Sequence, residues 1–107
     1  MNLHQPQRVV LKFPAPHRER TITVTEGAVV VLVDHQDGVP TLWVELDPGA
    51  PPVEWTVISV ATGDFDRIQP TDQHLGSFVV RGGQGTTGSY SWLVWHMYRR
   101  QGDHHDR

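Results

Sequence analysis

The sequence predicts an all-β fold, a small antiparallel β-sandwich or flattened barrel of about seven strands with little or no helix. Apolar residues alternate with polar ones or form short runs, and Val, Ile and Thr are abundant, as in strands. Gly and Pro punctuate the chain at short intervals, which is typical of sandwiches and barrels. An Asp37-Gly38 pair between two apolar runs predicts a β-hairpin, because a type I′ turn needs positive φ at both central residues.

Seven segments have strand character. In chain order they are Arg8 to Phe13, Arg20 to Thr25, Ala28 to Gln36, Pro40 to Leu46, Val53 to Ala61, Leu75 to Arg81 and Tyr90 to Arg99. Turn residues separate them, and the most room for a helical turn is at Asp64 to His74. Because 107 residues fit one domain, we expect a single all-β domain over 8–100, between a flexible N-terminus (1–7) and a flexible polar tail (101–107).

Composition argues against several classes of protein. The net charge is −3 and a single Lys accompanies eight Arg, which disfavours binding to nucleic acid. The chain has no Cys, so it has neither a disulfide framework nor a thiolate metal site. The N-terminus lacks the apolar core of a signal peptide, and no run approaches the roughly 18 apolar residues of a membrane span. We therefore expect a soluble, non-secreted protein with no membrane association.

The two faces of the predicted hairpin differ. A two-residue turn at Asp37-Gly38 makes Gln36 face Val39. An apolar core face then consists of three cross-strand pairs: Val33 with Leu42, Val31 with Val44 and Val29 with Leu46. The opposite face consists of Leu32 with Trp43, Val30 with Glu45 and Asp34 with Thr41. Because this second face is also partly apolar, Trp43 needs a cover: a loop, another strand or a partner subunit.

The two long strands later in the chain differ in pattern. Tyr90 to Arg99 is apolar on both faces, which is typical of a central strand or of a strand with one face in an interface. Val53 to Ala61 reads as an ordinary half-buried strand, with Val53, Trp55, Val57 and Ser59 on one face.

The seven histidines do not predict a metal site. His104 and His105 lie in the charged tail, and His4 and His17 flank loops. The remaining three, His35, His74 and His96, come from different segments without a local ligand pair such as His-x-His. We interpret His96, between Trp95 and Met97, as a core histidine with a satisfied ring nitrogen.

The glycine-rich segment Gly82 to Ser89 resembles a phosphate loop in composition only. A P-loop ends in Lys and leads into a helix, whereas a predicted strand follows here. We therefore predict a long flexible hairpin loop, with Arg81 at its edge keeping anion binding open. No Gly-x-Ser-x-Gly or other nucleophile signature is present, so we assign no catalytic residue and no cofactor, and an enzyme is the weaker hypothesis.

Motifs along the chain resemble those of a known family. Glu26-Gly27-Ala28, Asp37-Gly38-Val39-Pro40-Thr41-Leu42-Trp43 and Leu46-Asp47-Pro48 resemble small uncharacterised β-rich proteins of actinobacterial phages, prophages and their hosts. Val57 to Gly63, Leu75-Gly76, and Val94-Trp95-His96 with Tyr98 are similar to that family's later motifs. The chain departs from the pattern in a longer glycine-rich loop and at Asp64 to Asp72. The family has no established activity, so the resemblance implies a phage setting and no reaction.

These observations predict a small non-enzymatic, phage-type accessory protein that binds a protein partner, either a host factor or itself. The expected binding surface comprises Trp43, Leu32 and Val30 on the second hairpin face, together with Arg81, Gly83, Gln84 and Gly85 from the glycine-rich loop and its edge. One alternative is a structural or decoration component of a virion. Another is a small-ligand-binding or nucleotide-binding β domain, hydrolytic or not, that uses Arg81, the glycine-rich loop and one or more of His35, His74 and His96. The expected location is the host cytoplasm, or the virion for a structural component.

Overall fold

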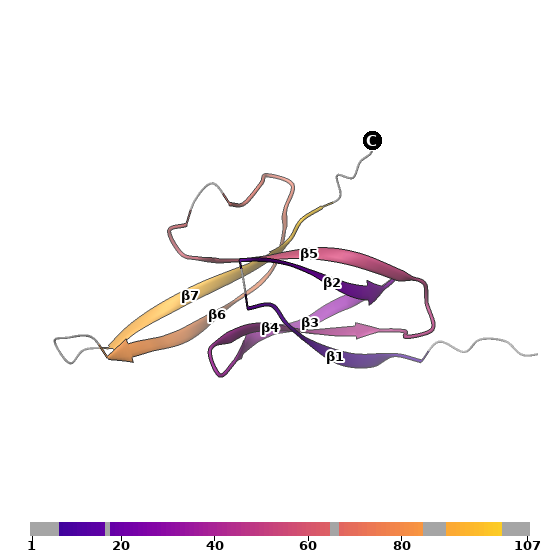
Figure 1. The fold of residues 1–107 in the computed structure, drawn as a ribbon, viewed down its shortest axis with the longest axis horizontal. Helices are drawn as coiled ribbons and strands as arrows, with labels where there is room; N and C mark the ends of the chain where they lie inside the picture. Colours follow the sequence, from indigo (N-terminus) through magenta and orange to yellow (C-terminus); the bar gives the residue numbers. More distant parts are fainter. Residues whose placement is uncertain (1–6, 17, 65–66, 85–89, 102–107) are drawn as a thin grey trace, which may run out of the picture.

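Seven strands make up the fold in Figure 1, a computed structural model that describes residues 7–16, 18–64, 67–84 and 90–101, the side chains of 82–84 and 90–92 excepted. The strands are β1 (Val9–Pro14), β2 (Glu19–Thr25), β3 (Val29–Gln36), β4 (Val39–Leu46), β5 (Pro52–Ala61), β6 (Gln73–Gln84) and β7 (Tyr90–Arg99). All seven predicted strands are confirmed, with ends that differ by a few residues. Except for Gln7 and Gln101, the termini predicted to be flexible lie outside the described residues.

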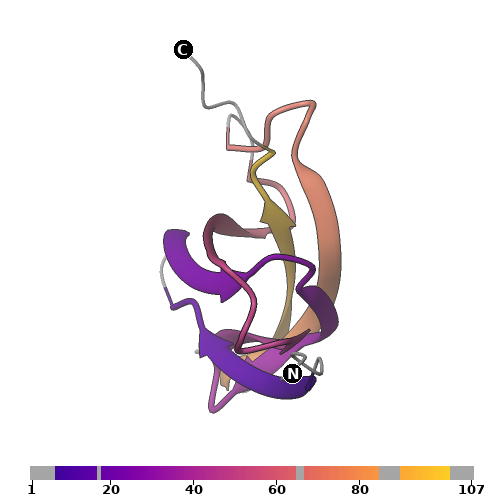
Figure 2. The same cartoon turned by 90° about the vertical axis from the view of Figure 1, so that its right-hand side faces the viewer.

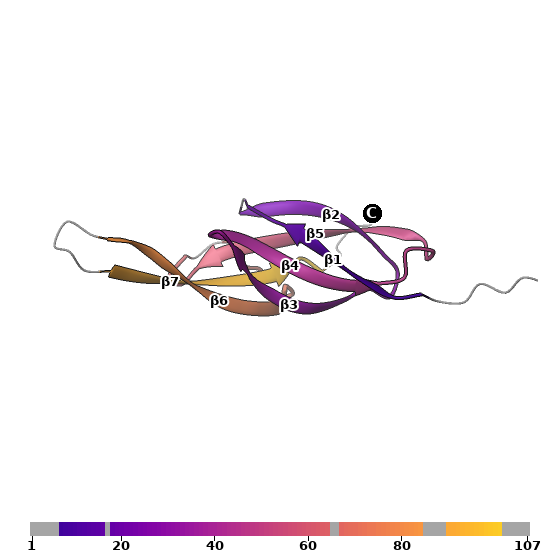
Figure 3. The same cartoon turned by 90° about the horizontal axis from the view of Figure 1, so that it is seen from below.

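Two antiparallel sheets pack against each other as a β-sandwich (Figures 1 and 3). One has the strand order β1-β4-β3 and the other β2-β5-β7-β6. This arrangement confirms the predicted fold class. The helical turn expected within Asp64 to His74 is wrong for the residues described there, which form turns and then begin β6. In the described part of the chain no helix is long and apolar enough to span a membrane.

The core lies between the two sheets. Its buried apolar side chains come from both of them, chiefly Ile22, Val24, Leu42, Val44, Leu46, Trp55, Val57, Phe78 and Met97. β3 and β6 of the two sheets approach closely at Gly76, where an added Cβ would lie only 3.0 Å from the Cβ of Val33. Glycine at this position therefore lets the two edge strands meet without a clash.

The hairpin turn forms as predicted. Asp37 and Gly38 have φ values of 53° and 81°, so both central residues are in the left-handed region that a type I′ turn requires. Gln36 faces Val39, and three predicted pairs beyond it are correct: Asp34 with Thr41, Val33 with Leu42 and Leu32 with Trp43. The register near the turn is thus fixed by local chemistry.

Farther from the turn, the predicted register of β3 is wrong. A β-bulge lies between Val30 and Leu32, so Val30 pairs with Val44 and Val29 pairs with Glu45. Val30 therefore packs against the core, while Val29 and Val31 are 52% and 49% exposed. The bulge inserts one extra residue into β3 and reverses the faces of the residues before it.

β7 is a central strand of its sheet, with β5 on one side and β6 on the other. This position confirms one of the two alternatives that the sequence left open for a strand with two apolar faces.

The prediction for β5 is partly wrong. Trp55, Val57 and Ser59 are buried as expected, but Ile58 and Val60 on the opposite face are buried too. The connection from β5 to β6 stands over this side of the sheet (Figures 1 and 2). The second half of β5 is therefore buried on both faces.

The far ends of β6 and β7 project beyond the other strands as a two-stranded ribbon (Figure 1). Pairing of β7 with β5 ends at Trp95, opposite Ala61, whereas pairing with β6 continues to Tyr90. Gly82, Gly83 and Gln84 belong to β6, so the glycine-rich segment begins as strand, and 85–89, which includes Gly85, lies outside the described residues.

Candidate functional site

The outer face of the three-stranded sheet, centred on Trp43, carries most of the predicted binding surface. Cross-strand pairing arranges its residues in three rows: Val10, Glu45 and Val29; Lys12, Trp43 and Leu32; Pro14, Thr41 and Asp34. We call these nine residues the Trp43 face. Trp43 is half-buried, and Val10, Val29 and Leu32 are 53%, 52% and 49% exposed. Within the described structure no element covers the apolar centre of this face.

Polar contacts border the Trp43 face along β1. The Arg8 Nε donates to Glu45 Oε2 at 3.1 Å, and the Lys12 Nζ donates to Gln36 Oε1 at 2.6 Å. On β3, the Asp34 Oδ1 accepts from the His35 N–H at 2.8 Å. These contacts are exposed or half-buried, so they contribute little to stability and leave the charges at the rim accessible.

The structure does not gather the other predicted binding residues on this face. Val30 points toward the core because of the bulge, which corrects its predicted place beside Trp43. Arg81, Gly83 and Gln84 lie on β6 of the other sheet, toward the projecting ribbon. The Trp43 face and the glycine-rich segment are therefore separate surfaces.

A chain of hydrogen bonds joins two histidines on the outer face of the four-stranded sheet. His74 Nε2 lies 3.0 Å from Ser77 Oγ, Ser77 Oγ lies 2.7 Å from His96 Nδ1, and His96 Nε2 lies 2.7 Å from Thr62 Oγ1. Thr62 Oγ1 donates to the Val94 carbonyl at 3.3 Å, so it accepts from the His96 Nε2–H, and Ser77 donates to Nδ1. His96 is thus satisfied at both nitrogens, as predicted, but it lies outside the core.

This polar chain does not build a hydrolytic site. A serine hydroxyl beside an imidazole is the first requirement for an activated nucleophile. Here Thr62, a neutral hydroxyl, takes the place of the carboxylate that would stabilise an imidazolium. Ser77 lies within extended β6 instead of on a sharp turn where backbone N–H groups could converge on an oxyanion. We interpret the chain as a polar cover of the sheet.

His35, the third histidine of that hypothesis, lies elsewhere. Its ring centroid is 6.0 Å from that of the buried Phe78, and its Nδ1 accepts from the Gly38 N–H at 3.1 Å. Among the described residues, no group of three or more His, Asp or Glu side chains could hold a metal ion.

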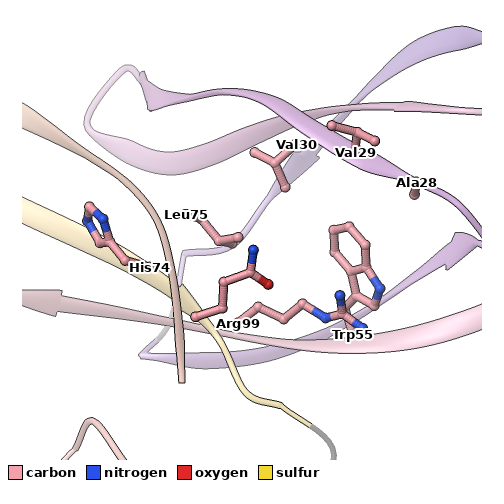
Figure 4. Close-up of a pocket in the computed structure, with 8 residues that line it drawn as sticks. Ala28, Val29, Val30, Trp55, His74, Leu75 and Arg99 are labelled. Atoms are coloured by element: carbon pink, nitrogen blue, oxygen red, sulfur yellow. The ribbon is translucent and has the colours of Figure 1, made fainter. Parts of the chain in front are cut away.

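A pocket of about 280 Å³ opens at one end of the core, between the start of β3 and the strands β5, β6 and β7 (Figure 4). Its lining comprises Ala28, Val29, Val30, Trp55, Gln73, His74, Leu75 and Arg99. The guanidinium carbon of Arg99 lies 4.4 Å from the centroid of the Trp55 ring. The Arg99 Nε is buried and has no hydrogen-bond partner, and burial lowers the pKa of Arg99.

The sequence interpretation missed this pocket, although one signal for it was present. Arg99 ends the predicted strand Tyr90 to Arg99 and Arg100 follows it directly, and neighbouring side chains of an extended chain point to opposite faces. Since one face of β7 packs on the core, one of the two arginines must point inward. That inference would have named Arg99 or Arg100 but not Trp55, whose contact with Arg99 depends on the pairing of β5 with β7.

Comparison with known proteins gives one match. A family model described as a domain of unknown function, DUF7352, matches residues 6–107. No curated protein and no solved structure matches the chain significantly. The matched range spans all seven strands, the Trp43 face and the pocket. The chain therefore belongs to the DUF7352 family.

Proposed function

We propose that this protein is a small, non-enzymatic accessory protein of phage type that acts by binding protein, and that its Trp43 face binds a second copy of the chain. The phage setting rests on the sequence resemblance alone. The observation that carries the binding proposal is the group of large apolar side chains, Val10, Val29 and Leu32, exposed by about half around Trp43. Exposed apolar clusters with a polar rim are typical of interaction surfaces.

The arrangement of the rows favours a symmetric pair. A two-fold axis parallel to β4 places β1 of one copy opposite β3 of the other. Val10 then faces Val29 of the partner subunit, and Trp43 meets Trp43 of the partner subunit at the axis. The two most exposed apolar positions therefore cover each other, while the aromatic side chains occupy the centre, where interface residues contribute most to affinity.

Charges at the rim complement each other in the same arrangement. Lys12 lies on β1 and Asp34 on β3, at opposite edges of the face and in adjacent rows. Within its own copy, the Lys12 Nζ contacts the amide of Gln36. In the dimer, Lys12 of each copy approaches Asp34 of the partner subunit, so the two-fold axis gives two such contacts. Opposite charges at these positions favour this register over others.

The size of the face sets the expected affinity. Three strands about 4.8 Å apart form a surface smaller than the roughly 800 Å² per partner of a standard stable interface. We therefore expect a dimer with a dissociation constant on the order of micromolar, which forms and dissociates with concentration.

The test compares two apolar sites with equal exposure. Leu32 on the Trp43 face and Val79 on β6 are both 49% exposed, so L32K and V79K place the same charge at equally accessible positions. Sedimentation equilibrium should show a concentration-dependent dimer for wild type and V79K, and a dissociation constant raised at least about tenfold for L32K, because burying a lysine opposes association.

Charge reversal then tests the register. K12E and D34K should each weaken the dimer, and the double variant should restore part of the lost affinity. A wild-type protein that stays monomeric up to several hundred micromolar, or an L32K variant that associates like V79K, would overturn the proposal.

A further inference from the structure

The pocket at the end of the core combines one cation with apolar and aromatic walls. Figure 4 shows the Arg99 side chain beside the Trp55 indole. Ala28, Val29 and Val30, at the start of β3, lie across the pocket from Arg99. The ring of His74 points away from these residues, toward Ser77. The groups left to contact a ligand are the Arg99 guanidinium, the Trp55 ring, the Gln73 amide and the aliphatic side chains.

Arg99 has a charge that the described structure leaves without a counter-ion. Arg99 takes part in none of the ion pairs described for Arg8 and Arg100, and its Nε is buried with no acceptor. The Arg99 side chain as a whole is half-buried. A buried N–H without an acceptor is costly, and contact with one aromatic ring offsets only part of that cost. Structural arginines are usually placed where carboxylates or carbonyls satisfy them, so this placement points to an anion from outside the chain.

We propose that the pocket binds a small monocarboxylate that carries an apolar or aromatic group. The planar guanidinium matches a carboxylate with two parallel hydrogen bonds, and one positive charge balances one negative charge. Ala28, Val30 and Leu75 accommodate the apolar part of the ligand, and Trp55 holds the guanidinium in place by stacking.

A polar group beside the arginine completes the site. Gln73 pairs with Arg99 across the β6–β7 ladder and lines the pocket. Its amide oxygen accepts from Gln101 Nε2 at 2.8 Å, which leaves its NH₂ group to donate to the ligand. The volume of about 280 Å³ lies at the small end of ligand pockets, so the site fits an aryl-acetate-sized molecule better than a nucleotide.

The first experiment tests whether binding depends on the negative charge of the ligand or only on its shape. Phenylacetate and its neutral isostere phenylacetamide are titrated into the full chain, and the indole N–H signal of Trp55 is followed by ¹H–¹⁵N NMR. The carboxylate should shift the Trp55 signal saturably, and the amide should bind at least about tenfold more weakly, because a charge-assisted pair is lost. Inorganic phosphate, as a third arm, should bind more weakly than phenylacetate.

The second experiment tests whether phenylacetate binding depends on Arg99 itself or on positive charge elsewhere on the protein. R99Q should lose phenylacetate binding, whereas R18Q, at an exposed arginine outside the pocket, should keep the wild-type affinity. R99K retains the charge without the planar fork and should weaken binding too. R99M should fold with about the wild-type stability, because the buried Nε of the half-buried Arg99 makes no hydrogen bond that the variant would lose.

Three results would overturn the proposal: equal affinity for the acid and its amide, wild-type affinity in R99Q, or no shift of Trp55 by acetate, phenylacetate or indole-3-acetate at about 10 mM. The comparison of acid with amide uses the wild-type chain, so it holds even where a variant fails to fold. Val29 belongs to both the Trp43 face and the pocket, whereas Leu32 does not line the pocket. Phenylacetate binding by L32K therefore shows whether the pocket acts without the dimer, and R99Q shows whether the dimer forms without the ligand.

Discussion

At the scale of single residues, Arg99 at the end of β7 and Arg100 directly after it show how extended backbone gives neighbours opposite roles. Arg99 faces the core side and stacks on Trp55. Arg100 faces the other side, where its Nε and Nη2 donate to the two carboxylate oxygens of Asp72 at 3.2 and 3.1 Å. Arg100 also donates to the Arg67 carbonyl at 3.0 Å, so it ties the β5–β6 connection to the sheet.

Asp72 should make stability depend on acid pH. Its side chain is fully buried against Arg100. Burial raises the pKa of the Asp72 carboxyl, but the hydrogen bonds from Arg100 and the Gln69 N–H, with the charge of Arg100, together hold that pKa below its ordinary value of 3.8. Because the folded-state pKa is the lower one, the stabilisation is full above pH 3.8 and is lost as the pH falls through the folded value.

We therefore expect D72N to lower the free energy of unfolding by roughly 1–3 kcal/mol at pH 7 and by little at strongly acid pH. Urea unfolding at a series of pH values measures this difference. Glu19 provides the control, because it reaches the same Arg100 at 3.7 Å with a side chain that is 62% exposed. E19Q should change stability by less than about 0.5 kcal/mol at any pH, and a D72N variant with the wild-type pH profile would contradict the assignment.

At the scale of elements, the strands were predictable because their signals are local. Alternation, β-branched residues and turn residues mark each strand within its own segment, and Asp37-Gly38 sets the first pairs of the hairpin. The bulge was not predictable, since positions 29–33 are all apolar and the sequence pattern does not distinguish one register from the next. Where a strand is apolar on both faces, only the opposing sheet decides which side chains point inward.

Two lysine substitutions distinguish the registers. In the regular register Val31 faces the core and Val30 faces outward, and the bulge reverses both. We expect V30K to lower the free energy of unfolding by about 2 kcal/mol or more, because a charge enters the core. V31K should change it by less than about 0.5 kcal/mol. Urea unfolding of the two variants checks this, and the opposite order would favour the regular register.

At the scale of the whole molecule, the two candidate surfaces differ in how far apart their residues are in the sequence. The Trp43 face is built mainly from one hairpin, so pairing across a two-residue turn predicted Leu32 beside Trp43. The pocket joins the start of β3, the middle of β5 and the ends of β6 and β7. Its residues meet only through the strand order of two sheets, which the sequence pattern does not specify.

The same strand order predicts where the molecule opens first. β6 is the edge strand of its sheet, and between Val79 and Gln84 it pairs with the part of β7 that precedes Trp95. The ladder between β5 and β7 does not extend into this part of β7, although the Thr62 N–H donates to the Val94 carbonyl at its border. Val79 and Leu93 are 49% and 45% exposed on this ribbon, so little apolar burial supports its hydrogen bonds. A two-stranded ribbon is marginally stable in water, in contrast to the four-stranded part of the sheet.

Hydrogen exchange by NMR measures this difference within a single strand. Among the β7 amides that are hydrogen-bonded to β6, those in 90–94 should exchange at least about tenfold faster than those in 95–99, because local opening of the ribbon leaves the core intact. The second group also lies beside β5, whose Val57 and Val60 are buried, so its exchange should require near-global unfolding. Uniform protection along β7 would contradict this account, since it would mean that the ribbon's exposed apolar side chains are covered in solution.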